Sequence, residues 1–335
     1  MNLISLLKSS FHPLILGHHN ADPDAVCSMI AVADICRKLN PKSMPKLACD
    51  DVSRLSMQVL DRFAPGAEIL ETVEDDHDLV ILVDTNSLLQ LGPNLKDVVV
   101  NPERTLVIDH HEPNPELDSI AKHAVVRSDR YSACEIIASL YDEVGLDIEV
   151  DTANLLLTGM LFDTRRFLYA DADTLIAATR LVHNGADYQS CMSSLAIKPS
   201  RSERIARLKA AGRLQVHNIG NWIIVTSRIK AFEASACRGL IGLGADVAIV
   251  SGSPSNGEVR LSSRSTTEFY EKTGVNLGSD VMEPLGELIE GKGGGHPNAA
   301  GANGRILGDK AVSRAVQLIR DAIKRGPSSE GDESS

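Results

Sequence analysis

The chain has 335 residues, of which 43% are hydrophobic and 24% are charged, and its formal net charge at pH 7 is −11. This length suits two domains that each bury a core, and the composition is typical of a globular protein. Charged residues and glycines interrupt every apolar run, and no export signal is visible at the N-terminus, so we expect a cytoplasmic protein with no membrane partner. The acidic charge argues against long duplex DNA as a partner, because DNA-binding proteins usually carry a basic stripe.

Strands and helices alternate in the first half of the chain. Apolar runs predict strands at residues 14–17, 46–49, 79–84, 105–109 and 124–126. Helical patterns predict helices at residues 25–39, 132–144, 152–167 and 173–183. Strands separated by helical crossovers predict an α/β fold whose N-terminal domain has a doubly wound, mostly parallel sheet.

The second half of the chain predicts a second, smaller α/β domain on a mixed sheet. A charged segment at residues 200–214 predicts a connecting helix, and strands are expected at residues 222–227, 247–251 and 259–263, with a turn at 253–257. Helices are expected at residues 280–290 and 310–325. We therefore expect a first domain at 1–195, a helical linker at 196–214, a second domain at 215–326 and a disordered tail at 327–335.

Three of the predicted strands end at Asp or His residues. The residues that follow or close these strands are His18, His19, Asp22 and Asp24 after the first, Asp84 after the third, and Asp109, His110 and His111 after the fourth. Parallel strands end at one edge of the sheet, where open α/β folds bind ligands, so we expect these side chains to lie together. Carboxylates mixed with imidazoles favour a transition dication such as manganese over calcium.

Each of these segments has a plainer interpretation when it is taken alone. Asp24 could cap a helix that starts near Ala25, and Asp22-Pro23 would pass as a turn. A single His is usually a surface or packing residue. Capping does not explain Asp or His at three separate strand ends, and the combined pattern therefore indicates a two-metal hydrolase.

Together with two further segments, these residues resemble the DHH phosphoesterase family. The family's motifs match His18, Asn20, Asp22 and Asp24 (His-x-Asn-x-Asp-x-Asp), then Asp84 after an apolar strand, then the triplet Asp109-His110-His111, then Asp163 on an apolar helix. The glycine-rich run at residues 293–301 resembles the motif of the family's associated C-terminal substrate domain. The resemblance covers nearly the whole chain. It departs from the family at Arg165, where many relatives carry Gly.

The resemblance implies a role for each matched residue in the first domain. One metal ion is expected on His18 and Asp22, a second on Asp24, His110 and Asp163, with Asp84 bridging both. His111 is expected to contact the substrate phosphate, and Asp109 to orient a neighbouring His during catalysis. The implied cofactor is a pair of Mn²⁺ ions, with Mg²⁺ or Co²⁺ as alternatives.

Further substrate contacts are expected from the glycine-rich run and from arginines. Gly293, Gly294 and Gly295 would let backbone N–H groups approach a phosphate, and His296 would hydrogen-bond a phosphate oxygen or a base edge. The alternative for such a run is an ordinary flexible loop. Arg264 matches a substrate-contacting position in similar proteins. The alternative interpretation is that it is an ordinary exposed residue at a strand end. Arg165 and Arg166 either bind phosphate or pair with Asp171 and Asp173.

The main functional prediction is a metal-dependent phosphodiesterase of short nucleotides. Its substrates would be oligoribonucleotides or linear or cyclic dinucleotides, with 3′-phosphoadenosine 5′-phosphate as a further candidate, and a homodimer is a candidate assembly. A processive single-strand exonuclease of the RecJ type is the second hypothesis, and the acidic charge argues against it. A non-catalytic nucleotide sensor is the third, and the complete ligand set argues against it. An inorganic pyrophosphatase would carry a different C-terminal type.

Overall fold

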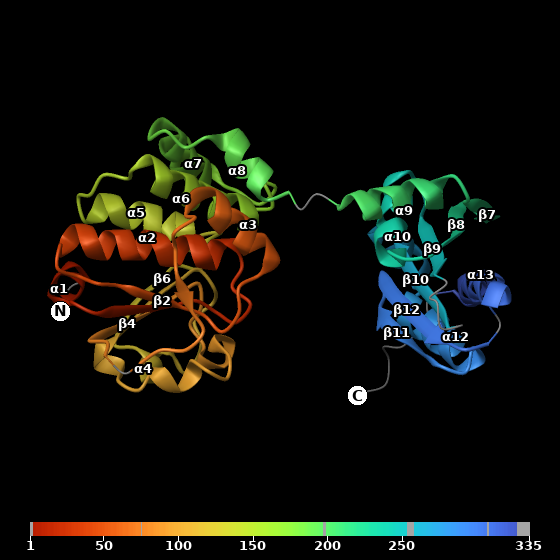
Figure 1. Cartoon of the computed structure of the whole chain (residues 1–335), viewed down its shortest axis with the longest axis horizontal. Coiled ribbons are helices and arrows are strands. Elements are labelled where there is room, and N and C mark those ends of the chain that lie inside the picture. The colour runs from red at the N-terminus through yellow and green to blue at the C-terminus, as the bar shows by residue number, and fades with distance from the viewer. Residues whose placement is uncertain (1–2, 75, 197–198, 253–257, 307, 327–335) are drawn as a thin grey trace, which may run out of the picture. The chain divides into compact units, whose positions relative to one another are not determined.

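The computed structural model describes residues 3–74, 76–196, 199–252, 258–306 and 308–326. The chain divides into two units, Met1–Ile197 and Lys198–Ser335, which are coloured from red to green and from green to blue in Figure 1. Helix α9 (Arg201–Ala211) occupies the segment predicted as a linker and packs into a core cluster of the second unit. The predicted turn at 253–257 and the predicted tail at 327–335 lie outside the described residues.

The first unit is built on a six-stranded sheet in the order β3-β2-β1-β4-β5-β6. Its strands are β1 (Pro13–Leu16), β2 (Lys46–Ala48), β3 (Ile69–Leu70), β4 (Leu79–Val83), β5 (Thr105–Asp109) and β6 (His123–Val126). All neighbouring strands are parallel, so the predicted doubly wound α/β fold is confirmed. The chain winds outward from β1 to β3 and then from β4 to β6 on the other side. The switch point lies between β1 and β4, where sheets of this type bind ligands.

Helices cover this sheet unequally on its two faces. They are α1 (Leu3–Ser9), α2 (Pro23–Leu39), α3 (Arg54–Phe63), α4 (Leu117–Ile120), α5 (Ala133–Glu143), α6 (Val150–Asp163), α7 (Ala172–His183) and α8 (Tyr188–Ser194). Ile15 points into the larger core, which includes residues of α2, α5 and α6, whereas its neighbours Leu14 and Leu16 point into a smaller core on the opposite face. Figure 1 shows α2 and α5 along one side of the sheet and α4 on the other.

All four predicted helices of the first unit differ from the prediction at one or both ends, and two of these ends carry site residues. Helix α2 begins at Pro23 rather than Ala25, because Asp22 is its N-cap. Helix α6 ends at Asp163 rather than at residue 167. Shortly after this end, Arg165, Arg166 and Phe167 have φ angles of 48°, 62° and 65°, which no right-handed helix accommodates. Asp163 is thereby placed at a helix end instead of inside a helix.

The second unit contains a mixed six-stranded sheet, as predicted, in the order β11-β12-β10-β9-β8-β7. Its strands are β7 (Gln215–Ile219), β8 (Trp222–Ile229), β9 (Val247–Gly252), β10 (Val259–Ser265), β11 (Lys292–His296) and β12 (Ala299–Gly304). The pair β8–β9 is parallel and the other pairs are antiparallel. Its remaining helices are α10 (Glu233–Gly242), α11 (Thr267–Thr273), η4 (Leu277–Met282), α12 (Glu283–Leu288) and α13 (Gly308–Arg325).

The glycine-rich run forms edge strand β11, so the alternative of an ordinary flexible loop is wrong. A β-carbon on Gly293 would clash with the carbonyl oxygen of Met282 in η4, and one on Gly295 would lie 2.5 Å from the carbonyl oxygen of Ala299. Two backbones therefore meet here at a distance that no side chain permits. The sequence shows that glycine is needed but does not show which backbone approaches it.

None of the helices in the described part of the chain is both long and apolar enough to span a membrane.

Candidate metal centre

Of the Asp and His residues predicted from three strand ends, all but His19 lie together at one edge of the first sheet, whereas His19 is exposed and belongs to none of the ligand groups. His18 follows β1, Asp84 follows β4, and Asp109 is the last residue of β5. Helix α2 brings Asp22 as its N-cap and Asp24 in its first turn, and α6 brings Asp163 at its end. The residues form three groups, and within each group the ligand atoms all lie within 4.8 Å of one another. The groups are His18, Asp22 and Asp84; Asp24, Asp84, His110 and Asp163; and Asp84, Asp109, His110 and His111.

Asp84 belongs to both of the groups that match the implied ligand sets. Its Oδ2 lies 3.7 Å from Nε2 of His18, and its Oδ1 lies 3.3 Å from Nε2 of His110. The backbone at Asp84 is left-handed, with φ of 58°, which is uncommon for a residue other than glycine. Oδ2 of Asp84 therefore faces His18, and Oδ1 faces His110, with Nδ1 of His111 3.9 Å away.

Asp22 has two structural contacts, one with each oxygen. Its Oδ1 accepts hydrogen bonds from the N–H groups of Asp24 (2.9 Å) and Ala25 (3.1 Å), which makes it the N-cap of α2. Its Oδ2 lies 3.8 Å from Nε2 of His18. The Nδ1 of His18 is 2.9 Å from the carbonyl oxygen of His19, and this contact turns Nε2 toward the carboxylates. The capping role considered for Asp24 therefore belongs to Asp22.

Asp24 is fully buried and is fixed by the first turn of another helix. Its carboxylate accepts hydrogen bonds from the N–H groups of Ala133 (2.6 Å) and Cys134 (3.1 Å), at the start of α5. Burial, together with the charges of Asp84 and Asp163, raises the pKa of this carboxyl well above its usual value. Three carboxylates this close require a compensating cation, because their mutual repulsion and desolvation are costly.

In the protein without metal, a protonated histidine supplies part of that compensation. Nε2 of His110 lies 3.3 Å from Asp84 and 3.2 Å from Asp163. Burial lowers the pKa of His110, but these two carboxylates outweigh burial and raise it to about 11. Burial raises the pKa of Asp84 to about 6. Oδ1 of Asp84 and Nε2 of His110 are nevertheless buried without a hydrogen-bond partner among the described residues, as expected of ligand atoms. The donor set therefore fits a pair of transition dications.

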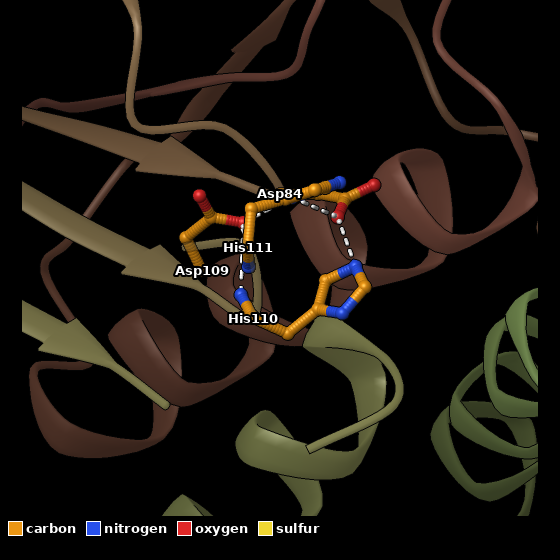
Figure 2. A group of neighbouring side chains, drawn as sticks. All are labelled: Asp84, Asp109, His110 and His111. Atoms are coloured by element: carbon orange, nitrogen blue, oxygen red, sulfur yellow. Dashed lines mark hydrogen bonds and ion pairs between the residues drawn. The ribbon is translucent and has the colours of Figure 1, made fainter. Parts of the chain in front are cut away.

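Asp109 contacts both His110 and His111, as Figure 2 shows. Its Oδ1 accepts hydrogen bonds from the backbone N–H of His110 (2.8 Å) and contacts Nδ1 of His111 (2.8 Å). Asp109 is buried, whereas the side chain of His111 is 52% exposed. The contact with Asp109 raises the pKa of His111, which favours a charged ring that can donate to an anionic ligand. His111 is thus accessible and oriented.

One buried residue of the site, Asn86, received no role from the sequence. Its Nδ2 donates to Oδ2 of Asp109 over 2.6 Å, on the side opposite His111. The only signal in the sequence is its place two residues after Asp84, in a segment that the strand leads into.

Arg165 and Arg166 are both exposed and form no ion pair within the described residues. The guanidinium of Arg165 lies over the ring of Tyr169, 5.3 Å from its centroid. Asp173 pairs instead with Arg130 (3.0 Å), and Asp171 caps α7. The alternative in which these arginines pair with the two aspartates is therefore wrong.

In the second unit, Arg264 and His296 lie in one row across three strands. Arg264 of β10 is in register with Ala299 of β12, which is in register with His296 of β11, so both side chains point to one face of the sheet. A β-carbon on Gly293 would clash with the backbone of Met282, and one on Gly294 would lie 3.7 Å from the side-chain carboxylate of Glu283 in α12. A β-carbon on Gly295 would clash with Ala299 and Ala300 of β12.

Comparison with known proteins identifies both halves of the chain. The model of the DHH family, N-terminal domain, matches residues 13–160, and the DHHA1 domain model matches residues 231–325. An uncharacterized protein of Methanocaldococcus jannaschii is 30% identical over 320 residues, which span 95% of this chain and 94% of that protein. A probable manganese-dependent inorganic pyrophosphatase of Bacillus mycoides is 33% identical over 163 residues, 46% of this chain and 48% of that protein.

A solved structure agrees with the fold over nearly the full length. It is an exopolyphosphatase-related protein from Bacteroides fragilis, with a TM-score of 0.59 and 18% identity, covering 96% of this chain and 94% of that one. The two matched domain models and the motifs that the site brings together lead to one assignment. The chain belongs to the DHH family of phosphoesterases and carries a DHHA1 domain.

Proposed function

We propose that this protein is a two-metal phosphodiesterase that hydrolyses short nucleotides, namely oligoribonucleotides or linear or cyclic dinucleotides. The observation that carries the proposal is the position of Asp84, which belongs to two ligand groups and turns one oxygen toward each. A carboxylate shared in this way suits a pair of dications, because it places negative charge between them.

In this proposal each site residue of the first unit has a distinct role. His18, Asp22 and Asp84 would hold one Mn²⁺, and Asp24, Asp84, His110 and Asp163 the other, with Mg²⁺ or Co²⁺ as alternatives. When bound, the ions supply Lewis acidity that lowers the pKa of a water and polarises a phosphoryl group. The exposed ring of His111 would donate a hydrogen bond to a phosphoryl oxygen and stabilise the charge that develops there. Asp109 would keep that ring in place.

Charge is distributed unevenly between the units and favours an anionic ligand for the second one. Residues 1–197 contain 15 Lys and Arg against 30 Asp and Glu, whereas residues 198–335 contain 19 against 15. On the sheet face of the second unit, Arg260 is paired with Glu233 at 2.8 Å, which leaves Arg264 and His296 for a ligand. A few cations suit a short nucleotide better than a long strand, which needs many phosphate contacts.

The choice of a nucleotide over pyrophosphate rests on the second unit. Similarity to the pyrophosphatases covers 46% of the chain, and the DHHA1 model matches residues 231–325. The first unit would then provide the shared phosphoryl chemistry, and the second unit would provide contacts to the remainder of a larger substrate. Arg264 and His296 are the residues proposed for those contacts.

The test is a comparison of initial rates with Mn²⁺ on pyrophosphate, linear and cyclic dinucleotides, pentanucleotides and strands of roughly 20 nucleotides, at low and high salt. We expect dinucleotides to pentanucleotides to be cleaved fastest, with mild inhibition by salt. A preference for the long strand with a steep salt dependence would identify a processive exonuclease instead. Preference for pyrophosphate would identify a pyrophosphatase, and nucleotide binding without turnover would identify a sensor.

A further inference from the structure

We propose that Asn86 is a positioning residue for this reaction, acting on His111 through Asp109. The inference rests on the proposed function in assigning His111 to the substrate phosphate. Asn86 is 5% exposed and lies just after Asp84, at the end of β4. It is not one of the implied metal ligands.

The side-chain amide of Asn86 is fully engaged by the next strand and its loop. Nδ2 donates to Oδ2 of Asp109 (2.6 Å) and to the carbonyl oxygen of Glu112 (3.0 Å). Oδ1 accepts from the N–H of Asn114 (3.1 Å). Because a carboxylate and a carbonyl only accept and a backbone N–H only donates, the orientation of the amide is fixed. Asn86 therefore joins the end of β4 to residues 109–114 after β5.

Asp109 links Asn86 to the ring of His111. Its two oxygens are divided, with Oδ2 held by Asn86 and Oδ1 held by His111 Nδ1 and the N–H of His110. Asp109 is completely buried, so loss of Asn86 would leave Oδ2 without its side-chain donor. The carboxylate would then turn to recover a partner, and its contact with the His111 ring would change.

Loss of Asn86 should disturb the metal ligands less than it disturbs His111. The ring of His110 is flanked by Asp84 and Asp163, and among the described residues the side chain of Asn86 forms no hydrogen bond with either of them. The ring of His111 is 52% exposed, and Asp109 is its hydrogen-bond partner among the described side chains. Replacement of Asn86 should therefore lower kcat and leave Mn²⁺ affinity nearly unchanged.

A double-mutant cycle tests this route directly. Asn86→Ala should lower kcat about tenfold in the wild-type background and have little further effect in His111→Ala, because the residue on which it acts is absent. Asn40→Ala is the matched control. Asn40 is also buried and braces a loop, through the carbonyl oxygen of Ser10 (2.9 Å) and the N–H of Lys42 (3.1 Å), but it does not contact the site. Its effect on kcat should be small and equal in both backgrounds.

Asn86→Asp supplies a second variant of nearly identical shape. It retains an acceptor for Asn114 but has no donor for Asp109, so it should lower kcat at least as much as Asn86→Ala. Full activity of Asn86→Asp, or an equal loss from Asn86→Ala with and without His111, would overturn the proposal.

Backbone hydrogen exchange provides a readout that does not depend on turnover. Asn86→Ala should accelerate exchange at His110 and Asn114, and Asn40→Ala should not. Unchanged exchange at these two residues in Asn86→Ala would also contradict the proposal. If the wild-type protein hydrolysed none of the substrates, the proposed function would fail, and the exchange experiment would still decide whether Asn86 holds this loop.

Discussion

A β-carbon placed on Gly159 would lie 2.7 Å from Oδ1 of Asp24 and would also clash with the Sγ of Cys134. Gly159 lies one turn before Asp163 on α6, so both residues are on the same face of that helix. The same helix face therefore approaches one predicted ligand closely and supplies another. This contact explains why an apolar helix in the larger core contributes to a polar site.

Gly159→Ala should weaken binding of the ion assigned to Asp24, His110 and Asp163. Alanine gains about 1 kcal/mol of helix propensity over glycine, but overpacking a tight contact costs about 1–3 kcal/mol, so we expect net destabilisation. Calorimetric titration with Mn²⁺ should show one weakened site and one normal site. Gly242→Ala, at the end of α10 where a β-carbon meets nothing within 4 Å, is the control, and it should leave both Mn²⁺ sites unchanged without destabilising the protein. Two unchanged sites in Gly159→Ala would contradict this account of the contact.

The two contacts of Asp22 can be separated by two substitutions. Asp22→Ser keeps a capping oxygen for α2 but removes the carboxylate that faces His18, whereas Asp22→Ala removes both. Both variants should lose one Mn²⁺ ion, and Asp22→Ala should in addition be less stable by about 1 kcal/mol. Metal analysis and chemical denaturation of the metal-free proteins measure the two effects. Equal stability of the Ser and Ala variants would show that the cap contributes nothing measurable.

Manganese binding should release protons and strengthen as pH rises. Burial lowers the pKa of His18, but Asp22, the His19 carbonyl and Asp84 outweigh it and raise the pKa to about 9, while that of His110 is about 11. Both rings are therefore protonated near neutral pH without metal, and a ligating ring must be neutral. Affinity should rise by up to roughly tenfold per pH unit for each proton released. Calorimetry at several pH values, in buffers of different ionisation enthalpy, measures both the affinity and the number of protons released. An affinity that does not change with pH would contradict this prediction.

Arg264 and His296 should affect substrate binding without affecting the metals. Either residue changed to Ala should raise KM for a dinucleotide several-fold, because each removes about one charge-assisted hydrogen bond to an anion. Mn²⁺ stoichiometry should stay at the wild-type value, since both residues lie in the second unit. Arg260→Ala, which removes a cation already paired with Glu233 on the same face, is the control. An equal effect of all three changes would point to net charge rather than to these two residues.

The sequence was sufficient to predict the fold class and the grouping of the site because both follow from short-range patterns. An apolar run that ends at Asp84 shows a strand and a strand-end carboxylate together, and parallel strands necessarily end at one edge. It was not sufficient for the contacts made across the fold. The bonds from Ala133 and Cys134 to Asp24 join residues more than 100 positions apart, and no local pattern indicates them.

The other differences between the prediction and the structure involve glycine and asparagine residues. The run Gly293-Gly294-Gly295 is as consistent with a loop as with a strand, and the choice depends on how closely η4 packs against it. Asn86 resembles any turn residue after a strand until its partners Asp109, Glu112 and Asn114 are known. In both cases the residue type reflects a neighbour that is distant in the sequence.

In the proposed site a single carboxylate, that of Asp84, serves two metal ions. The most direct test is the number of Mn²⁺ ions bound per chain by Asp84→Asn, which keeps the shape of the side chain but removes its charge. This variant should lose both ions and all activity, whereas Asp22→Ser and Asp163→Asn should each lose one ion. Retention of the wild-type number of ions in Asp84→Asn, or the loss of no more than one, would contradict this assignment of Asp84.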